Sequence, residues 1–172
     1  MITRVHTDGA TLSEAIYSPC ERYRYGLSRI WDDAGGVVLF VMLNPSTATE
    51  LRNDPTIERC ERRTRAMGYG GFRIANLFGL RATRPQDLKA ATDPVGGGND
   101  EILHRWGQGA EMTIAAWGVH GAHLGQGRRV AQVLPQLWHL GLTKDGHPRH
   151  PLYVPYATGP ALWPREKRYS DD

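Results

Sequence analysis

Residues 37–47, VVLFVMLNPST, decide the fold that we expect for this chain. Seven consecutive apolar residues follow Gly35 and Gly36, and such a run is typical of a strand buried on both faces in a parallel sheet. The run ends at Asn44 in a short polar loop. Ligands of open α/β sheets bind at the carboxyl ends of the strands, so this loop is a candidate site. Asn-Pro-Ser-Thr is equally typical of an ordinary turn, and this stretch alone leaves both interpretations open.

Strand and helix patterns alternate on both sides of this run. Before it, ERYRYGLSRIW alternates arginines with apolar residues, which predicts a half-buried strand that forms a hairpin with the strand at 37–43. After it, helical spacing predicts a helix at about 55–67, which Asp54 caps and Gly68 ends. The remaining expected elements are a strand at 72–78, a helical turn from 85, a helix near 100–106 capped by Asn99, a strand at 112–117, a helix at 128–140 that Pro135 kinks or splits, and a strand at 151–156.

This order of elements predicts an α/β fold. We expect a three-layer α/β/α sandwich around a mostly parallel sheet, with the N-terminal strand antiparallel. The chain of 172 residues is long enough for one domain with a proper core and too short for two. Within that single domain, 1–172, we expect an irregular lead-in at 1–20 and a polar C-terminal tail at 161–172 that frays.

Composition limits the function only loosely. The chain is 40% hydrophobic and 23% charged, with a net charge of +3 and a preference for arginine. These values suit a globular protein and are compatible with DNA or a nucleotide as partner, without establishing one. We expect Cys20 and Cys60 to be free thiols. The N-terminus lacks a basic start followed by an apolar core, and no run approaches about 18 apolar residues, so we expect no signal peptide, no membrane span and a cytoplasmic protein.

Two groups of arginines each have two interpretations. They are Arg22 and Arg24 on the first expected strand, and Arg59, Arg62, Arg63 and Arg65 on the helix at 55–67. A row of arginines on one face can contact the phosphates of a nucleic-acid backbone. A plain solvated face is the commoner explanation for both groups, and we take it as the expectation.

Polar and aromatic side chains gather where the expected parallel strands end. These are Asn44, Pro45, Ser46 and Thr47 after the first strand, Asn76 and Arg81 at the second, and Trp117 and His120 at the third. We expect them to form one binding site at the carboxyl edge of the sheet. The amide of Asn76 presents a donor beside an acceptor, which suits the edge of a planar heterocycle; a buried structural hydrogen bond is the alternative.

Several familiar chemistries lack their motifs. The triple glycine at 96–98 is not followed by Gly-Lys-Ser/Thr, so no P-loop is present, and no G-x-S-x-G nucleophile elbow occurs. The pairs His120/His123 and His147/His150 have metal-like spacing. They lie in loops rich in glycine and proline, without an obvious carboxylate or thiolate companion. We therefore expect no metal and no cofactor.

The sequence carries a run of motifs that is similar to one family. These motifs are RYRYGLSRIWD, VMLNPSTA, NDPTIERC, GYGGFRIANLFGLRAT, PVGGGND, AAWGVHG and LGLTKDGHPRHPLY. They resemble the bacterial and phage proteins grouped as domain of unknown function 1643, over about residues 21–153, which implies a family core at about 21–156. The fold in turn resembles, more distantly, that of the uracil-DNA glycosylase superfamily.

The superfamily resemblance implies roles for three residues. Asn44, in a loop shaped by Pro45, resembles the residue that positions the hydrolytic water. Asn76 resembles the residue that reads the base, and His150 begins a last motif that stabilises the leaving base. These groups imply catalysis without a metal or cofactor. Leu152 stands where a serine is expected, the first motif has no strong catalytic aspartate, and the four cysteines of the iron–sulfur branches are absent.

Three functions stay open at this point, because a fold does not fix a function. The leading hypothesis is a metal-independent hydrolase that cleaves the N-glycosidic bond of a base in nucleic acid or in a nucleotide. The first alternative is a non-catalytic nucleic-acid-binding module that keeps the pocket. The second is a small-molecule enzyme that uses the same strand-end pocket. All three require Asn44, Asn76 and His150 to lie close together.

Overall fold

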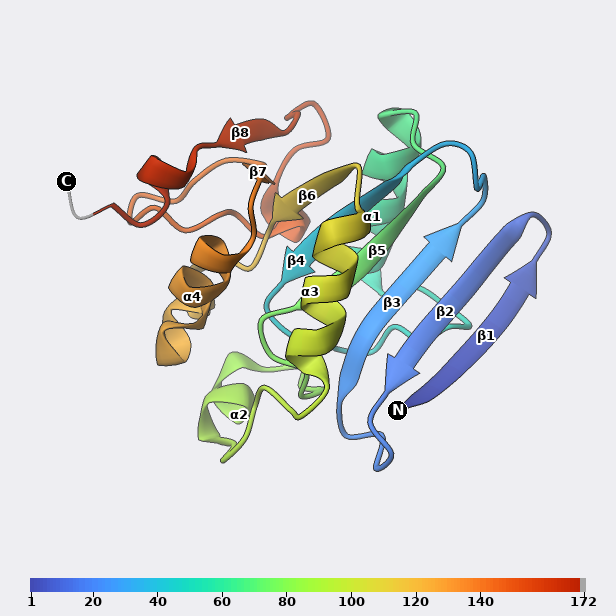
Figure 1. The fold of residues 1–172 in the computed structure, drawn as a ribbon, viewed down its shortest axis with the longest axis horizontal. Coiled ribbons are helices and arrows are strands. Elements are labelled where there is room, and N and C mark those ends of the chain that lie inside the picture. The colour runs from blue at the N-terminus through green and yellow to red at the C-terminus, as the bar shows by residue number, and fades with distance from the viewer. Residues whose placement is uncertain (171–172) are drawn as a thin grey trace.

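A mixed sheet of eight strands carries the fold of residues 1–170, the residues that the computed structural model describes (Figure 1). The strands are β1 Ile2–Asp8, β2 Thr11–Tyr17, β3 Arg24–Ile30, β4 Val37–Met42, β5 Gly71–Asn76, β6 Met112–Ala115, β7 Leu137–His139 and β8 Ala161–Trp163. Their spatial order is β1-β2-β3-β5-β4-β6-β7-β8. The apolar runs correctly predict β4, β5 and β6 at the centre, and the α/β class is confirmed.

Parallel pairing is limited to the centre of the sheet. β4 runs parallel to β5 and β6, and β6 runs parallel to β7, whereas the other neighbours pair antiparallel. The expected mostly parallel sheet is therefore wrong. The expected hairpin between β3 and β4 is also wrong, because Leu27 of β3 lies opposite Ile74 of β5, and β5 separates the two strands.

The N-terminal lead-in is not irregular. β1 and β2 form an antiparallel hairpin that turns at Gly9, whose φ of 58° lies in the left-handed region that favours glycine. β2 then pairs with β3, so the hairpin extends the sheet at one edge. No residue of β1 is fully buried, and an edge strand of this kind offers no apolar run from which a strand can be predicted.

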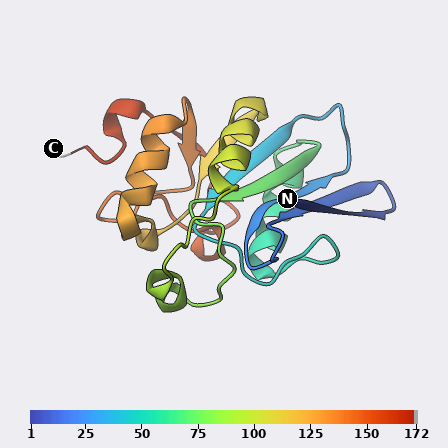
Figure 2. The same cartoon turned by 60° about the horizontal axis from the view of Figure 1, so that its bottom comes forward.

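Helices pack on both faces of the central strands (Figure 1 and Figure 2). They are α1 Pro55–Ala66, α2 Pro85–Ala90, α3 Asn99–Gly109 and α4 Gln126–Val133. Successive residues of β4 point to opposite faces. Leu39 and Val41 join the core under α3 and α4, whereas Val38 and Phe40 pack with α1. No helix within residues 1–170 has the length and apolarity needed to cross a membrane.

Capping residues and prolines set the ends of these helices. Asp54 caps α1 as predicted, because its Oδ1 accepts the backbone N–H of Ile57 at 2.9 Å. α4 ends at Val133 rather than at residue 140. Pro135 lacks an N–H and disfavours a helical conformation at Leu134, which is extended, and the strand β7 follows.

Two C-terminal predictions are wrong. The segment 151–156 begins with a 3₁₀ turn, Pro151–Tyr153, instead of forming a strand. The tail does not fray as far as residue 170, because β8 joins the sheet and the buried Arg168 donates to the carbonyl oxygens of Ala131, Leu134 and Trp163. Residues 171–172 of the expected tail lie outside the described residues.

Several arginines expected on solvated faces are internal. Arg24 and Arg29 of β3 are 1% and 4% exposed, and Arg63 of α1 is 5% exposed. Arg59 and Arg63 donate to backbone carbonyl oxygens in the loop at 151–158. The expectation of a solvated face is therefore wrong for Arg24 and Arg63, whereas Arg59 is half-buried. The guanidinium groups of Arg59 and Arg63 hold the protein's own backbone and are not free to contact phosphates.

Candidate functional site

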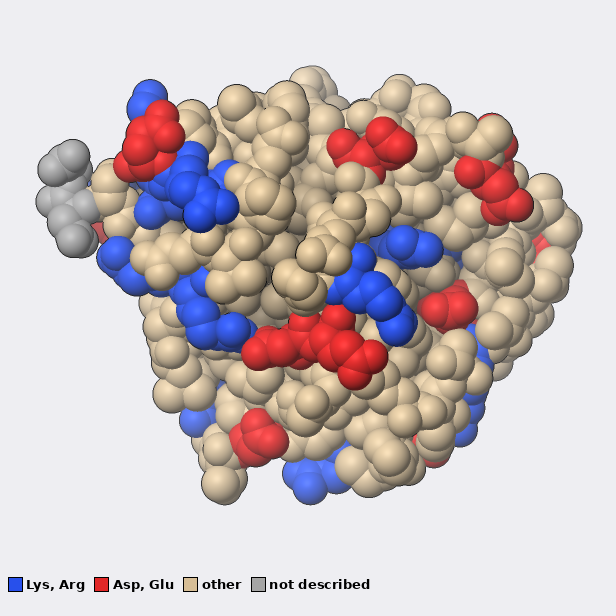
Figure 3. Space-filling model, viewed as in Figure 1, with Lys and Arg blue, Asp and Glu red and all other residues tan. Residues whose placement is uncertain are grey.

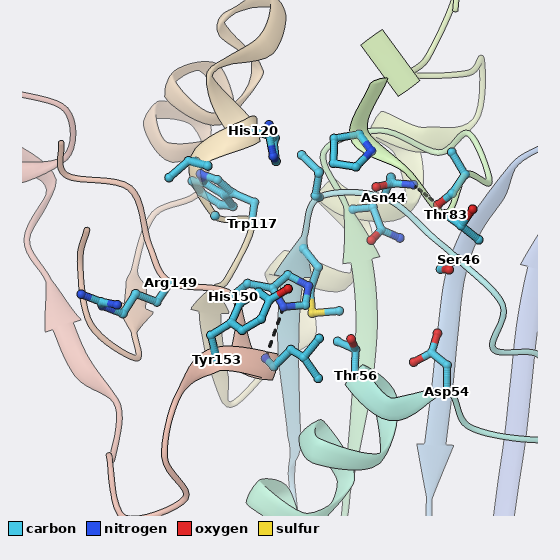
Figure 4. A pocket seen from close by; sticks show the side chains of 18 of the residues that line it. Asn44, Ser46, Asp54, Thr56, Thr83, Trp117, His120, Arg149, His150 and Tyr153 are labelled. Carbon is cyan, nitrogen blue, oxygen red and sulfur yellow. Dashed lines mark hydrogen bonds between the residues drawn. The ribbon is translucent and has the colours of Figure 1, made fainter. Parts of the chain in front are cut away.

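A cavity of about 450 Å³ opens at the carboxyl ends of β4 and β5 (Figure 4). Its walls come from the loop after β4, the N-terminus of α1, the loop after β6 and the 3₁₀ turn Pro151–Tyr153. The polar and aromatic side chains that line it are Arg24, Asn44, Ser46, Asp54, Thr56, Asn76, Thr83, Trp117, His120, Thr143, Arg149, His150 and Tyr153. Its volume falls within the usual range of small-molecule sites.

Asn76, the last residue of β5, lines this cavity with 1% of its surface exposed. Its backbone oxygen accepts a hydrogen bond at 2.9 Å from Asn99, which lies inside α3 instead of capping it. Neither Nδ2 nor Oδ1 of Asn76 has a partner among the described residues. Buried amides are normally satisfied, and an unmade bond is costly. The side chain is therefore suited to a ligand that offers a donor beside an acceptor.

Asn44 begins the loop after β4, and its nitrogen is committed to the protein. Nδ2 donates to the carbonyl oxygens of Ala82 at 2.9 Å, Pro45 at 3.0 Å and Leu80 at 3.4 Å. Because all three neighbours are acceptors, the amide oxygen has to point the other way. That oxygen accepts no hydrogen bond from residues 1–170, so it is available to a water molecule or a ligand in the cavity.

His150 faces the cavity from the 3₁₀ turn, across from Asn44 and Asp54 (Figure 4). The backbone N–H of Leu152 donates to its Nδ1 at 3.2 Å, so the neutral ring carries its proton on Nε2. Burial lowers the pKa of His150, and the nearby carboxylate of Asp54 opposes this shift. At neutral pH the ring is therefore an uncharged donor through Nε2–H.

Two charged residues of the cavity have functional potential that the sequence pattern does not indicate. Asp54 has only a capping role in that pattern, although its place directly after a strand-end loop could have marked it. Arg24 is expected on a solvated face, yet it is buried and donates to the carbonyl oxygen of Ala48. Burial lowers the pKa of Arg24 to about 10, so it stays charged at neutral pH.

The structure brings most of the predicted site residues together. Asn44, Ser46, Asn76, Trp117, His120 and His150 line the one cavity, and their functional roles stay predictions. Pro45, Thr47 and Arg81 do not line it. Arg81 lies over the ring of Tyr17, at 5.5 Å from the ring centre, and Thr47 is exposed. The further lining residues Thr56, Thr83, Thr143, Arg149 and Tyr153 are not marked by any sequence pattern, because most of them lie in loops that lack periodicity.

The two histidine pairs with metal-like spacing diverge in space. His123 packs against Phe78, with ring centres 5.6 Å apart, and His147 packs against Tyr169 at 5.5 Å. Only the other member of each pair lines the cavity. The described part of the chain has no group of three or more His, Cys, Asp or Glu side chains arranged to hold a metal ion.

Comparison with known proteins gives one assignment. A family model described as "Protein of unknown function (DUF1643)" matches residues 24–152. The chain belongs to this family. The DUF1643 match begins at Arg24 and ends at Leu152, so it contains every lining residue of the cavity except Tyr153. No curated protein and no solved structure matches the chain. The resemblance to the uracil-DNA glycosylase superfamily therefore stays a prediction.

Proposed function

We propose that the protein is a metal-independent hydrolase that cleaves the N-glycosidic bond of a nucleobase in the strand-end cavity. The observation that carries this proposal is the buried amide of Asn76, whose donor and acceptor are both unmatched by the described residues. Nucleobases are planar rings that present donors and acceptors side by side along one edge. One base can therefore satisfy both atoms of the amide at once.

Two further groups have suitable chemistry for hydrolysis. The free amide oxygen of Asn44 is an acceptor that can orient a water molecule, and Nε2–H of His150 is a donor that can bond an oxygen of the departing base. In the reaction, water oxygen bonds to the anomeric carbon as the C–N bond breaks. The electron pair of that bond goes to the base, and a proton from water completes the free base. The proposed site needs no metal for this step.

A fold like that of the uracil-DNA glycosylases belongs to the same proposal. Its support is the core on each face of the central strands, one packed with α1 and the other with α3 and α4. Ligands of such sheets bind at the carboxyl ends of the parallel strands, where the cavity lies.

The distribution of charge favours a nucleoside or nucleotide over a long nucleic acid as substrate. Figure 3 shows basic and acidic side chains side by side over α3 and α4, without a continuous basic band on this face. Arg129 of α4 pairs with Asp100 of α3 at 2.8 Å. Arg59 and Arg63 of α1 bond backbone carbonyl oxygens. Tight binding of a long polyanion depends on many free cations along its path.

The test is release of free base. Nucleosides, nucleotides and oligonucleotides that carry uracil, mismatched thymine, hypoxanthine or modified pyrimidines are incubated with the protein, and the products are separated by chromatography. We expect release from at least one substrate. Asn44→Ala should lose most of the rate while binding is retained, because a water-positioning group acts mainly in the transition state. Asn76→Ala should relax the choice of base.

His150 provides the sharpest control in this experiment. His150→Ala should slow the release of base. We expect it to raise the activation free energy by about 2 to 4 kcal/mol, the usual effect of losing a donor to a developing anion. His104→Ala, an exposed histidine on α3, should not change the rate. No release from any member of the panel would reject the hydrolase. Salt-sensitive binding of the oligonucleotides without release would favour the non-catalytic nucleic-acid-binding module.

A further inference from the structure

Arg24 differs from the other buried arginines of residues 1–170. Those others are Arg29, Arg63 and Arg168, and each donates to three or more oxygens of the protein. Arg24 donates only from Nη1, to the carbonyl oxygen of Ala48. Its Nε is buried without a partner, as is Nε of Arg63. An arginine that serves only the fold is expected to donate from more of its five guanidinium N–H groups to the protein.

The positive charge of Arg24 also has no carboxylate paired with it. The side chain lines the cavity, only 1% of it is exposed, and no carboxylate within the described residues forms an ion pair with it. Its pKa of about 10 keeps it protonated at pH 7. A buried charge without a counter-ion costs several kcal/mol. An anionic group that enters the cavity would offset this cost.

The carboxylate of Asp54 does not take that place. Its Oδ1 accepts the N–H of Ile57 at 2.9 Å, and its Oδ2 accepts the N–H of Ala48 at 3.3 Å. Asp54 therefore acts on Arg24 only through space. The negative charge of Asp54 is stabilised by the backbone N–H groups of Ala48 and of the N-terminus of α1.

Asn76 limits which anions can bind beside Arg24. The backbone N–H of Arg24 donates to the carbonyl oxygen of Gly79, in the loop that follows Asn76, and the side chains of Arg24 and Asn76 line the same cavity. A phosphodiester or a fully ionised phosphate offers acceptors only, so it would leave Oδ1 of Asn76 without a donor. A planar ring that carries negative charge next to an N–H group satisfies both residues.

We propose that Arg24 binds the anionic form of a planar heterocycle whose edge is held by Asn76. This inference rests on the proposed function, in which the base departs with the electron pair of the C–N bond and the resulting negative charge lies beside the guanidinium. Arg24 thereby selects bases that are good anionic leaving groups. Because a free heterocycle can bind without reacting, the assignment is tested separately from hydrolysis.

The test compares two free heterocycles by calorimetry with the full-length chain. Barbiturate is a planar six-membered ring that is an anion at neutral pH, and uracil has the same ring size but is neutral. Wild type should bind barbiturate about tenfold more tightly or better, the ratio that one charge-assisted hydrogen bond supplies. Arg24→Met should bring the two affinities together, and Arg24→Lys should keep part of the difference.

Arg73→Met is the matched control, because Arg73 lies on β5 beside the ring of Trp106 and does not line the cavity. It removes the same net charge and should keep the wild-type ratio. Equal affinity of wild type for both rings, or no binding of barbiturate, overturns the inference. So does inorganic phosphate that binds in an Arg24-dependent manner while barbiturate does not. If Arg24→Met fails to fold, the inference is decided by the ratio of barbiturate to uracil affinity in wild type and in Arg24→Lys.

The hydrolase proposal and the assignment of Arg24 can be rejected independently of each other. A barbiturate preference that depends on Arg24, without base release from any substrate, supports this inference and rejects the hydrolase. Base release without a preference for the anion keeps the hydrolase and overturns the assignment of Arg24.

Discussion

At the scale of single residues, Asn76 and Asn99 form a natural pair for comparison. Both are buried, and Oδ1 has no partner in either, but Nδ2 of Asn76 is also without one, whereas Nδ2 of Asn99 donates to the carbonyl oxygens of Asn76 and Leu77. An unsatisfied buried group is costly to the folded state, and a satisfied one is costly to remove. The two amides should therefore respond in opposite ways to the same substitution.

We expect Asn76→Leu to leave the free energy of unfolding within about 1 kcal/mol of wild type or to raise it. The substitution removes two buried polar atoms, Nδ2 and Oδ1, that have no hydrogen-bond partner. Asn99→Leu should lower that free energy by about 1 to 3 kcal/mol, because it removes the side-chain donor to the carbonyl oxygen of Asn76 and leaves that of Leu77 with Gln126 as its side-chain donor. Urea unfolding of the two variants measures both effects. If Asn76→Leu is the more destabilising variant, the amide of Asn76 has a structural role.

His150 gives a prediction on pH. Burial lowers its pKa from the usual 6.5, so the unfolded chain binds a proton before the folded protein does as the pH falls. Stability should therefore decline from about pH 6.5 downward, until the lowered pKa of the folded state is reached. His120 and His139 are shifted in the same direction and share the effect.

His150→Gln should remove part of this decline, because glutamine does not titrate. Urea unfolding at about pH 7.5 and about pH 5.5 measures the loss of stability for wild type and variant. An identical loss in both proteins would mean that the pKa of His150 is not lowered by its position in the cavity.

The sequence predicts some site residues better than others. Asn44 follows one apolar strand and Asn76 ends another, so their position at the carboxyl edge can be foreseen. Arg24 cannot be foreseen, because a buried arginine and a solvated one look alike in an alternating strand. Which of the two occurs depends on partners such as Ala48 and Gly79, which are distant in the sequence.

At the scale of elements, the N-terminus of α1 joins the fold to the site. Asp54 accepts the N–H groups of Ile57 and Ala48 and also lines the cavity. We expect Asp54→Ala to lower the free energy of unfolding by about 1 kcal/mol, the usual effect of losing a helix cap. Asp54→Asn should lose less, since its amide oxygen still caps the helix. Thermal or urea unfolding measures the order, and equal stability of all three proteins would contradict the capping role.

Elements that carry their own pattern are predicted well. The continuous apolar run of β4 and the cap and spacing of α1 are local properties. β1 has no fully buried residue, and β7 and β8 are three residues each, so none offers a period long enough to recognise. The split between α4 and β7 depends on the stronger effect of Pro135, which ends a helix rather than kinking it.

At the scale of the whole molecule, strand order is the feature that the sequence hides. β5 lies between β3 and β4, although it follows both in the chain. Such pairing depends on contacts between distant segments, and a local pattern does not record it. The direction of the central strands was nevertheless sufficient to bring the strand-end residues to one edge.

The inward placement of arginines predicts weak binding to long nucleic acid. Because Arg59 and Arg63 bond the loop at 151–158, few of the arginines on α1 remain to neutralise phosphates. We expect the affinity for a duplex oligonucleotide to change little with salt, with a logarithmic slope corresponding to about one or two phosphates. Fluorescence anisotropy over a range of salt concentrations measures the slope. A steep slope would identify a basic track and favour a nucleic-acid partner.

The most direct measurement for the whole account is the release of free base from nucleosides and nucleotides by wild type, Asn44→Ala and Asn76→Leu, prepared side by side. We predict release by wild type, loss of most of the rate in Asn44→Ala with binding retained, and loss of binding in Asn76→Leu with stability retained. Release by wild type that persists unchanged in both variants would place the chemistry outside this cavity. No release from any substrate by wild type would contradict the proposed hydrolase.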